Sequence, residues 1–219
     1  VVATGTYKED IDFLGKNIVL TSTNPLDATV VATTVLRGLN IRSPAITFTP
    51  QILGNTFGVL KGFTIFAHDN HGIDCNFTMA TLENNVIKSG PIIDPNGPVR
   101  NNRIEGGPGI IDPGNATCII EGNTILSGGI QGQFSFPTIR DNLITGVSGR
   151  AITECHGLIE GNTITYNGYG AIGDCDGTIR RNVVAFNTTP NRFSDRAGIS
   201  YCDGIIEENR IFRNTTEAS

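Results

Sequence analysis

The segment CHGLIEGNTITYN, residues 155–167, is followed twenty positions later by CDGTIRRNVVAFN, residues 175–187. Both copies keep Cys, Gly, Ile and Asn in the same places, but Glu160 in the first becomes Arg180 in the second. Self-similarity at a fixed period is typical of solenoids, in which each repeat packs only on its neighbours. The two copies therefore predict stacked coils of about 20 residues each.

The same unit recurs along most of the chain, and Asn is its most constant residue. Apolar residues lie three positions before and two positions after it, as Ile159 and Ile164 flank Asn162. Short β-branched runs bounded by Gly predict strands. We expect the Asn side chains to point inward and to form a structural ladder of amide hydrogen bonds between coils. The ladder residues are Asn85, Asn102, Asn123, Asn142, Asn162, Asn182 and Asn209.

The spacing of the repeat distinguishes three architectures. Leucine-rich repeats need an apolar residue five positions before the Asn, where this chain has Gly157 and Gly177. Left-handed hexapeptide helices need a nearly strict period of six, whereas the Asn residues are 17 to 27 positions apart. A right-handed parallel β-helix tolerates such variable turns. The sequence thus predicts an all-β fold, a single-stranded right-handed parallel β-helix of roughly nine to ten coils.

We expect one domain over residues 1–219. Residues 1–57 repeat less regularly and are interpreted as the first coils with a loop, and residues 58–214 as the regular coils. The chain also opens directly in an apolar stretch and stops where another coil could begin. Because open ends expose strand edges and core, we expect them to be capped by another chain or by further segments.

A charged residue lies two positions before each ladder Asn, and its sign alternates from coil to coil. Equivalent residues of stacked coils lie about 4.8 Å apart, so opposite charges attract and like charges repel. The alternation also disfavours a slip of one coil, which would bring like charges together. We interpret this row as structural: Lys61, Glu83, Arg100, Glu121, Arg140, Glu160, Arg180 and Glu207.

Two further positions of the repeat are informative. Gly or Asn stands five residues after the ladder Asn, which predicts a left-handed turn residue at Gly90, Gly107, Gly128, Asn167, Asn187 and Asn214. Cys stands seven residues before it, at Cys155, Cys175 and Cys202, and the FSF run at residues 134–136 fills the matching region one coil earlier. We expect these Cys residues, with Cys75, to be buried free thiols.

Composition excludes several classes of partner. The formal net charge is −5 and there is no basic stretch, so nucleic acid is not expected to bind. No apolar run is long enough to span a membrane. The five Cys residues form no CxxC pair, which argues against a disulfide framework and against a zinc site.

The coils resemble the parallel β-helix repeats of secreted carbohydrate-active proteins, a superfamily that includes pectate lyases and polygalacturonases. The resemblance lies in GFTIFAHDNHGIDC (residues 62–75), in TLENNVIKSG (residues 81–90) and in the opening 23 residues, which are similar to the first coils of large exported bacterial proteins. It implies a secreted or cell-surface protein of a bacterium, periplasmic or extracellular, whose partner is a polysaccharide or a cell-surface glycan.

Acidic residues gather on the face formed by the first strand of each coil and the turn after it. Two hypotheses follow: a scaffold or carbohydrate-binding protein without catalysis, or a polysaccharide lyase or glycoside hydrolase. For an enzyme, the candidate catalytic residues are Glu154, Asp174, Asp203 and His156. The candidate binding residues are Asp94, Asp112, Asp176, Tyr201, Arg150 and Arg196.

The enzyme hypothesis makes geometric demands. Glu154 and Asp174 on adjacent coils would place carboxylates about 5 Å apart, as in retaining glycosidases, and Glu154 and Asp203 about 9 Å apart, as in inverting ones. A lyase would instead hold Ca²⁺ on acids such as Asp174 and Asp176, with Arg150 or Arg196 as the base. No cofactor other than Ca²⁺ is suggested. The structural alternative is a solvated acidic rim, because Asp suits turns for its own reasons.

Overall fold

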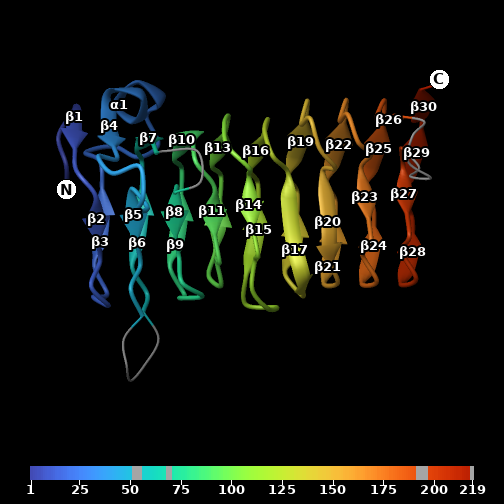
Figure 1. The fold of residues 1–219 in the computed structure, drawn as a ribbon, viewed down its shortest axis with the longest axis horizontal. Coiled ribbons are helices and arrows are strands. Elements are labelled where there is room, and N and C mark those ends of the chain that lie inside the picture. Colours follow the sequence, from blue (N-terminus) through green and yellow to red (C-terminus); the bar gives the residue numbers. More distant parts are fainter. Residues whose placement is uncertain (51–55, 68–70, 191–196, 218–219) are drawn as a thin grey trace.

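The computed structural model describes residues 1–50, 56–67, 71–190 and 197–217. Nearly all of its elements are short strands that pair in parallel and stack into an elongated solenoid, with the first coils at one end and the last at the other (Figure 1). The predicted all-β parallel β-helix is confirmed. Arg196 lies outside the described residues.

Three long parallel sheets form the sides of the solenoid, and in a regular coil the chain visits them in a fixed order. The first sheet contains β2 (Ile11–Asp12), β5 (Ile46–Thr47), β8 (Ile73–Asp74), β11 (Ile92–Ile93), β14 (Ile110–Ile111), β17 (Ile130–Ser135), β20 (Ile152–Cys155), β23 (Ile172–Gly173) and β27 (Ile199–Ser200). The second contains β3 (Val19–Thr21), β6 (Val59–Lys61), β9 (Thr81–Glu83), β12 (Val99–Arg100), β15 (Ile119–Glu121), β18 (Thr138–Arg140), β21 (Leu158–Glu160), β24 (Thr178–Arg180) and β28 (Ile205–Glu207).

The third sheet contains β1 (Gly5–Lys8), β4 (Thr34–Arg37), β7 (Thr64–Phe66), β10 (Val86–Ser89), β13 (Arg103–Ile104), β16 (Thr124–Ile125), β19 (Leu143–Thr145), β22 (Thr163–Thr165), β25 (Val183–Ala185) and β29 (Arg210–Phe212). A small fourth sheet pairs β26 (Thr188–Pro190) with β30 (Thr215–Glu217). The less regular early segment holds a short helix, α1 (Ala28–Thr33), whose N-cap Asp27 accepts hydrogen bonds from the N–H groups of Thr29 and Val30.

Equivalent residues of neighbouring coils lie directly over one another. Ile159 pairs with Ile139 on one side and with Ile179 on the other. All three side chains are fully buried, and similar columns of Ile and Val fill the space between the three sheets. Burial of these columns supplies the main stabilisation of the fold, since each fully buried Ile contributes about 1.5–3 kcal/mol.

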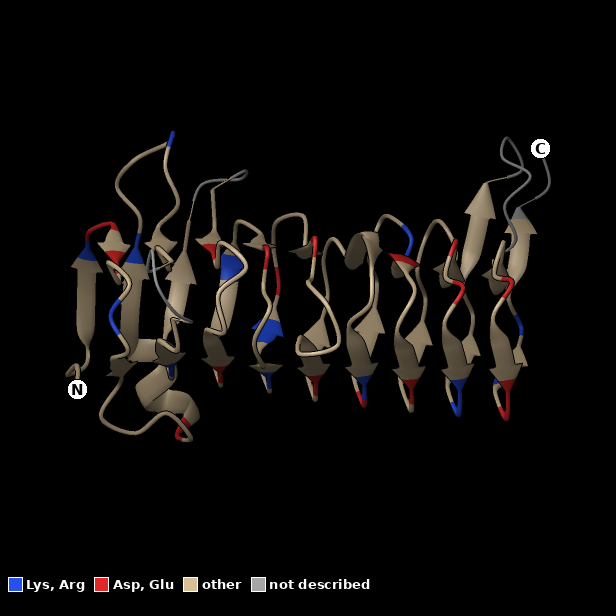
Figure 2. Cartoon of the chain, turned by 90° about the horizontal axis from the view of Figure 1, so that it is seen from below, with Lys and Arg blue, Asp and Glu red and all other residues tan. Residues whose placement is uncertain are grey.

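The predicted charge row crosses the second sheet at the C-terminal ends of its strands, where Figure 2 shows basic and acidic residues alternating. Glu121 sits between two arginines and forms ion pairs with both, at 2.7 Å from Arg100 Nε and 2.5 Å from Arg140 Nη2. Glu160 bonds to Arg180 Nε at 2.9 Å, and this contact holds the pKa of the Glu160 carboxyl below its usual range. The side chains are partly exposed, so each pair contributes modestly to stability.

The Asn ladder is continuous through seven coils, and Asn162 shows its chemistry. Asn162 Oδ1 accepts from the backbone N–H of Asn142 at 3.0 Å and from Asn142 Nδ2 at 2.9 Å. Asn162 Nδ2 donates to Asn182 Oδ1 and to the carbonyl of Ile139, both at 3.0 Å. Every hydrogen-bonding atom of this fully buried amide is therefore used.

A second Asn ladder, which the sequence did not predict, lies at the end of the third sheet. The backbone N–H of Val147 donates to Asn167 Oδ1, that of Asn167 to Asn187 Oδ1, and that of Asn187 to Asn214 Oδ1. The expectation of a left-handed backbone at these Asn residues is wrong, because the left-handed residue comes one position earlier, at Tyr166, Phe186 and Arg213. The expectation is correct for Gly90, Gly107 and Gly128.

Gly157, Gly177 and Gly204 stand five positions before their ladder Asn, and Gly is needed there because the coils approach closely. A Cβ at Gly177 would lie 2.0 Å from the carbonyl oxygen of Gly157, and a Cβ at Gly204 would lie 2.0 Å from that of Gly177. Any larger residue would push neighbouring coils apart. The Gly that separates this repeat from a leucine-rich repeat is therefore a requirement of coil stacking.

The last coil leaves core positions exposed. Ile206 is 44% exposed, whereas Ile179, its partner one coil earlier, is fully buried. Within the described part of the chain, none of the helices is long and apolar enough to cross a membrane.

Replacing Asn162 by Ala should lower the free energy of unfolding by about 3 kcal/mol, because the backbone N–H of Asn142 and the carbonyl of Ile139 lose buried partners. Urea denaturation followed by circular dichroism measures the change. The control is Asn115→Ala, at an exposed Asn, which should change stability by less than about 0.5 kcal/mol. Equal effects of the two substitutions would show that the ladder does not stabilise the fold.

Candidate functional site

The corner between the first and second sheets carries the predicted site residues. From the coil of β8 onward, each coil turns this corner through a residue with left-handed backbone, a conformation that Asp and Asn tolerate better than most side chains. We call these residues the corner row: Phe77, Asp94, Asp112, Phe134, Glu154, Asp174 and Tyr201. Backbone geometry therefore accounts for part of the acidic stack that the sequence shows.

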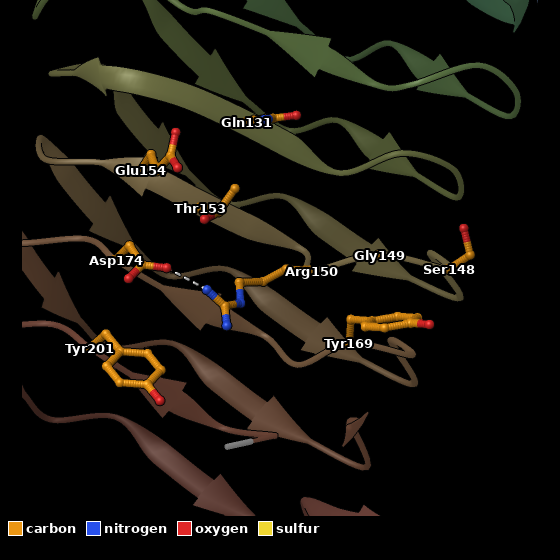
Figure 3. A pocket seen from close by; sticks show the side chains of 9 residues that line it. All are labelled: Gln131, Ser148, Gly149, Arg150, Thr153, Glu154, Tyr169, Asp174 and Tyr201. Atoms are coloured by element: carbon orange, nitrogen blue, oxygen red, sulfur yellow. Dashed lines mark hydrogen bonds and ion pairs between the residues drawn. The ribbon is translucent and has the colours of Figure 1, made fainter. Parts of the chain in front are cut away.

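A shallow hollow of about 660 Å³, open to solvent, lies beside the corner row over β20 and β23 (Figure 3). Four predicted residues line it, namely Glu154, Asp174, Arg150 and Tyr201. We call it the tyrosine hollow, because Tyr169 and Tyr201 are both exposed in it. The remaining lining residues are Gln131, Ser148, Gly149, Thr153 and Tyr169.

An ion pair forms the floor of the tyrosine hollow. Arg150 Nη1 lies 2.6 Å from Asp174 Oδ2, and Figure 3 shows the two side chains turned toward one another. The Arg150 side chain is largely buried because it lies over Gly173, where a Cβ would come within 2.2 Å of Nη1. Gly173 thus leaves the space that lets a guanidinium rest on the outer surface of the first sheet.

The residues just beyond the corner form a separate hydrogen-bonded row. His156 Nδ1 accepts from the backbone N–H of Asp176 at 3.0 Å, and Asp176 Oδ1 accepts from that of Asp203 at 3.0 Å. Phe134 and Phe136 pack against the His156 ring, with centroids 5.5 and 5.9 Å away. None of His156, Asp176 and Asp203 lines the tyrosine hollow.

A second, smaller hollow of about 330 Å³ lies further along the corner row, between Phe77 and Phe134. We call it the phenylalanine hollow. Asp112 lines it, and Asp94 is the next residue of the corner row. The pKa of Asp94 is raised from 3.8 to about 6, first by burial and then by the nearby carboxylates of Asp112 and Asp74.

The Cys residues form a stacked row of free thiols behind the corner. Cys155, Cys175 and Cys202 succeed one another, and the backbone N–H of Cys155 donates to Cys175 Sγ at 3.4 Å. The expectation that phenylalanine replaces Cys one coil earlier is wrong. Ser135 pairs with Cys155 instead, and its neighbours Phe134 and Phe136 point outward into solvent.

The thiols differ in their protonation. Burial raises the pKa of Cys118 and of Cys155 to about 12, and it raises that of Cys75 as well. Half-buried Cys202 differs, because its hydrogen bond with Cys175 lowers its pKa and raises that of Cys175. Only a thiolate reacts as a nucleophile, so we expect Cys202 to be the most reactive of the five.

The predicted Ca²⁺ ligands have protein partners. Asp174 pairs with Arg150, and Asp176 accepts from Asp203. Over the described ranges, no group of three or more His, Cys, Asp or Glu side chains is arranged to hold a metal ion. Ca²⁺ binding at Asp174 and Asp176 stays a prediction.

The structure thus divides the predicted site residues into three groups. Arg150, Glu154, Asp174 and Tyr201 share the tyrosine hollow. Asp112 lines the phenylalanine hollow, with Asp94 next to it in the corner row, and His156, Asp176 and Asp203 form the hydrogen-bonded row. Sequence reasoning missed Tyr169 and Gln131. Tyr169 lies in the connection between the third and first sheets, where the repeat gives no register, and the insertion at residues 132–134 obscured the alignment around Gln131.

Comparisons with protein-family models, with curated proteins and with solved structures found no match for this chain. The fold assignment therefore depends on the structure itself.

Replacing Asp94 by Asn should stabilise the protein by about 1 kcal/mol at pH 7, allowing for solvent screening of a partly exposed carboxyl. Because the folded-state pKa is about 6 and the ordinary value is 3.8, the stability that the protonated carboxyl contributes is complete below pH 3.8 and lost as pH rises through 6. In urea titrations, the difference in the free energy of unfolding between the variant and the parent protein should accordingly grow between pH 4 and 6. A difference that does not vary with pH, or one matched by Asp203→Asn, would contradict the carboxyl cluster.

Cys202 should be the first thiol to react with a maleimide at pH 7.5. We expect one fast-labelled Cys per folded chain and five in urea, as counted by mass spectrometry. Cys202→Ser should remove the fast phase and Cys118→Ser should leave it unchanged. Fast labelling that survives in Cys202→Ser would contradict the assignment.

Proposed function

We propose that this β-helix is an exported or cell-surface carbohydrate-binding protein that holds a glycan in the tyrosine hollow without catalysing a reaction on it. The observation that carries the proposal is the pairing of two exposed tyrosines, Tyr169 and Tyr201, with the Arg150–Asp174 ion pair in one open depression. The resemblance of the coils to pectate lyase-like proteins agrees with it.

The chemistry of the lining suits a sugar. A sugar ring presents apolar C–H faces, which pack on aromatic rings, and hydroxyl groups, which both donate and accept hydrogen bonds. Tyr201 is 54% exposed and offers its ring to such a face. Glu154 and Asp174 supply acceptors, Arg150 supplies donors, and Gln131 and Thr153 supply both.

The shape of the hollow favours binding over catalysis. Enzyme pockets commonly bury most of the ligand, which strengthens electrostatic interactions in the absence of water. The tyrosine hollow is shallow and open to solvent. It suits one side of a long polymer that is recognised while much of its surface stays hydrated.

A second candidate function is a glycoside hydrolase, since Glu154 and Asp174 line the same hollow. One feature weighs against it. Asp203, the partner expected for an inverting geometry, belongs to the hydrogen-bonded row and not to the hollow. For the related alternative of a polysaccharide lyase, Arg150, the expected base, is already engaged in an ion pair with Asp174.

The exposed Ile206 and Ile211 of the last coil suit a surface that another coil or chain covers. End-capping by such a segment is part of the proposal. Covering this end would bury core positions that are already buried in every earlier regular coil.

Binding should be measured on an array of neutral and acidic glycans and then by calorimetry with the best ligand. Tyr201→Ala and Asp174→Asn should each weaken binding about tenfold, because each removes one ring face or one charged acceptor. The matched control is Tyr166→Ala, since Tyr166 is an exposed tyrosine outside the hollow. It should leave the affinity within twofold.

The same ligand should be incubated with the protein, with and without Ca²⁺, and its length followed by chromatography. We expect no shortening. If the glycan is shortened and Asp174→Asn abolishes the shortening, the protein is a hydrolase and not a binding protein. If Tyr201→Ala and Tyr166→Ala bind the glycan with equal affinity, the tyrosine hollow is not the site.

A further inference from the structure

The corner row repeats a chemical pattern that the proposed function does not use. Its residues are in turn aromatic, acidic, acidic, aromatic, acidic, acidic and aromatic, and both hollows lie along it. Phe134 divides the row into two bays. The second bay, from Phe134 to Tyr201, adjoins the tyrosine hollow. The first, from Phe77 to Phe134, contains the phenylalanine hollow.

The first bay has two apolar walls. Phe77 is 53% and Phe134 is 72% exposed, so each presents much of its ring to solvent. They stand three coil steps apart, roughly 14 Å at the spacing of parallel strands. Exposed aromatic side chains on both sides of a polar depression are typical of binding sites.

Between Phe77 and Phe134 the hollow is acidic, and no Lys or Arg among its described lining residues neutralises this charge. Asp112 lines the hollow, and Asp94 and Asp74 are close enough to raise the Asp94 pKa through repulsion. In the second bay, by contrast, Arg150 neutralises Asp174. None of the nine described residues that line the phenylalanine hollow is Lys or Arg. Crowded carboxylates of this kind favour a cation.

The walls and floor also carry neutral hydrogen-bonding groups. Asn96, Asn115 and Gln133 line the hollow with side-chain amides. These three amides can both donate hydrogen bonds to the hydroxyl groups of a sugar and accept hydrogen bonds from them.

We propose that the phenylalanine hollow is a second binding site, which takes an amino sugar with a protonated amine. The ammonium pairs with Asp112, next to Asp94, the apolar face of the ring packs against Phe134 or Phe77, and the hydroxyls bond to the side-chain amides. The site is distinct from the tyrosine hollow, whose paired Arg150 and Asp174 leave less net charge.

Binding of the ammonium is linked to the proton on Asp94. The cation favours the ionised carboxylate, so it lowers the Asp94 pKa from about 6, and the protein releases protons on binding below that pH. Affinity should therefore rise as pH increases from 5 to 6.5 and should fall with added salt. The carboxylates of Asp112 and Asp74 are the charged groups that act on Asp94.

The test compares two oligosaccharides of equal length by calorimetry at pH 6.5, a glucosamine oligomer with free amines and its fully N-acetylated counterpart. We expect the charged oligomer to bind at least tenfold more tightly. Asp112→Asn and Phe134→Ala should each reduce its affinity about tenfold. Phe57→Ala, at an exposed phenylalanine outside the hollow, is the matched control and should have no effect.

NMR titration of the Asp94 carboxyl supplies an independent readout, since its pKa should fall when the glucosamine oligomer is present. Circular dichroism confirms that each variant is folded before it is compared. Equal affinities for the two oligomers, or an unaffected Asp112→Asn variant, would overturn the proposal. Tyr201→Ala separates the two sites: it should weaken binding at the tyrosine hollow and leave charge-selective binding intact, so either site can fail alone.

Discussion

The structure depends on one contact, in which a buried side chain accepts the backbone N–H of the neighbouring coil. At each ladder Asn the chain turns sharply, and the N–H at the turn would otherwise be buried without a partner. The amide of the next coil supplies an acceptor there and a donor for a carbonyl one coil back. This bond fixes which residues of neighbouring coils lie over one another. The Ile columns, the charge row and the corner row all follow from that register.

The same solution appears with different chemistry at other turns. Asn167 and Asn187 repeat it with amides at the end of the third sheet, and the thiols of Cys175 and Cys202 accept backbone N–H groups behind the corner. His156 and Asp176 also accept backbone N–H groups, but from the following coil and not from the preceding one. Several residues that resemble a catalytic set thus have a structural use, and the groups that we propose to bind ligands line the two hollows.

The sequence predicts what repeats and misses what interrupts the repeat. The columns through Ile159, the Asn ladder and the pairing of Glu160 with Arg180 follow from a period of about 20 residues, because stacking makes equal positions neighbours. The second ladder was missed because Gly and Asn share its position and suggest a common backbone conformation. The sequence predicted only some of the residues that line the hollows. Tyr169 lies in an irregular connection and Phe134 in an insertion, and the repeat period gives no information at such positions.

The alternating charge row has a consequence for how such a protein can change its length. Duplication or loss of one coil would place two like charges on adjacent strands, whereas a change of two coils keeps every neighbour opposite in sign. Genetic gain and loss in this lineage should therefore proceed in units of about 40 residues, two copies of the period read here. The alternating charges thus favour solenoids that gain or lose an even number of coils.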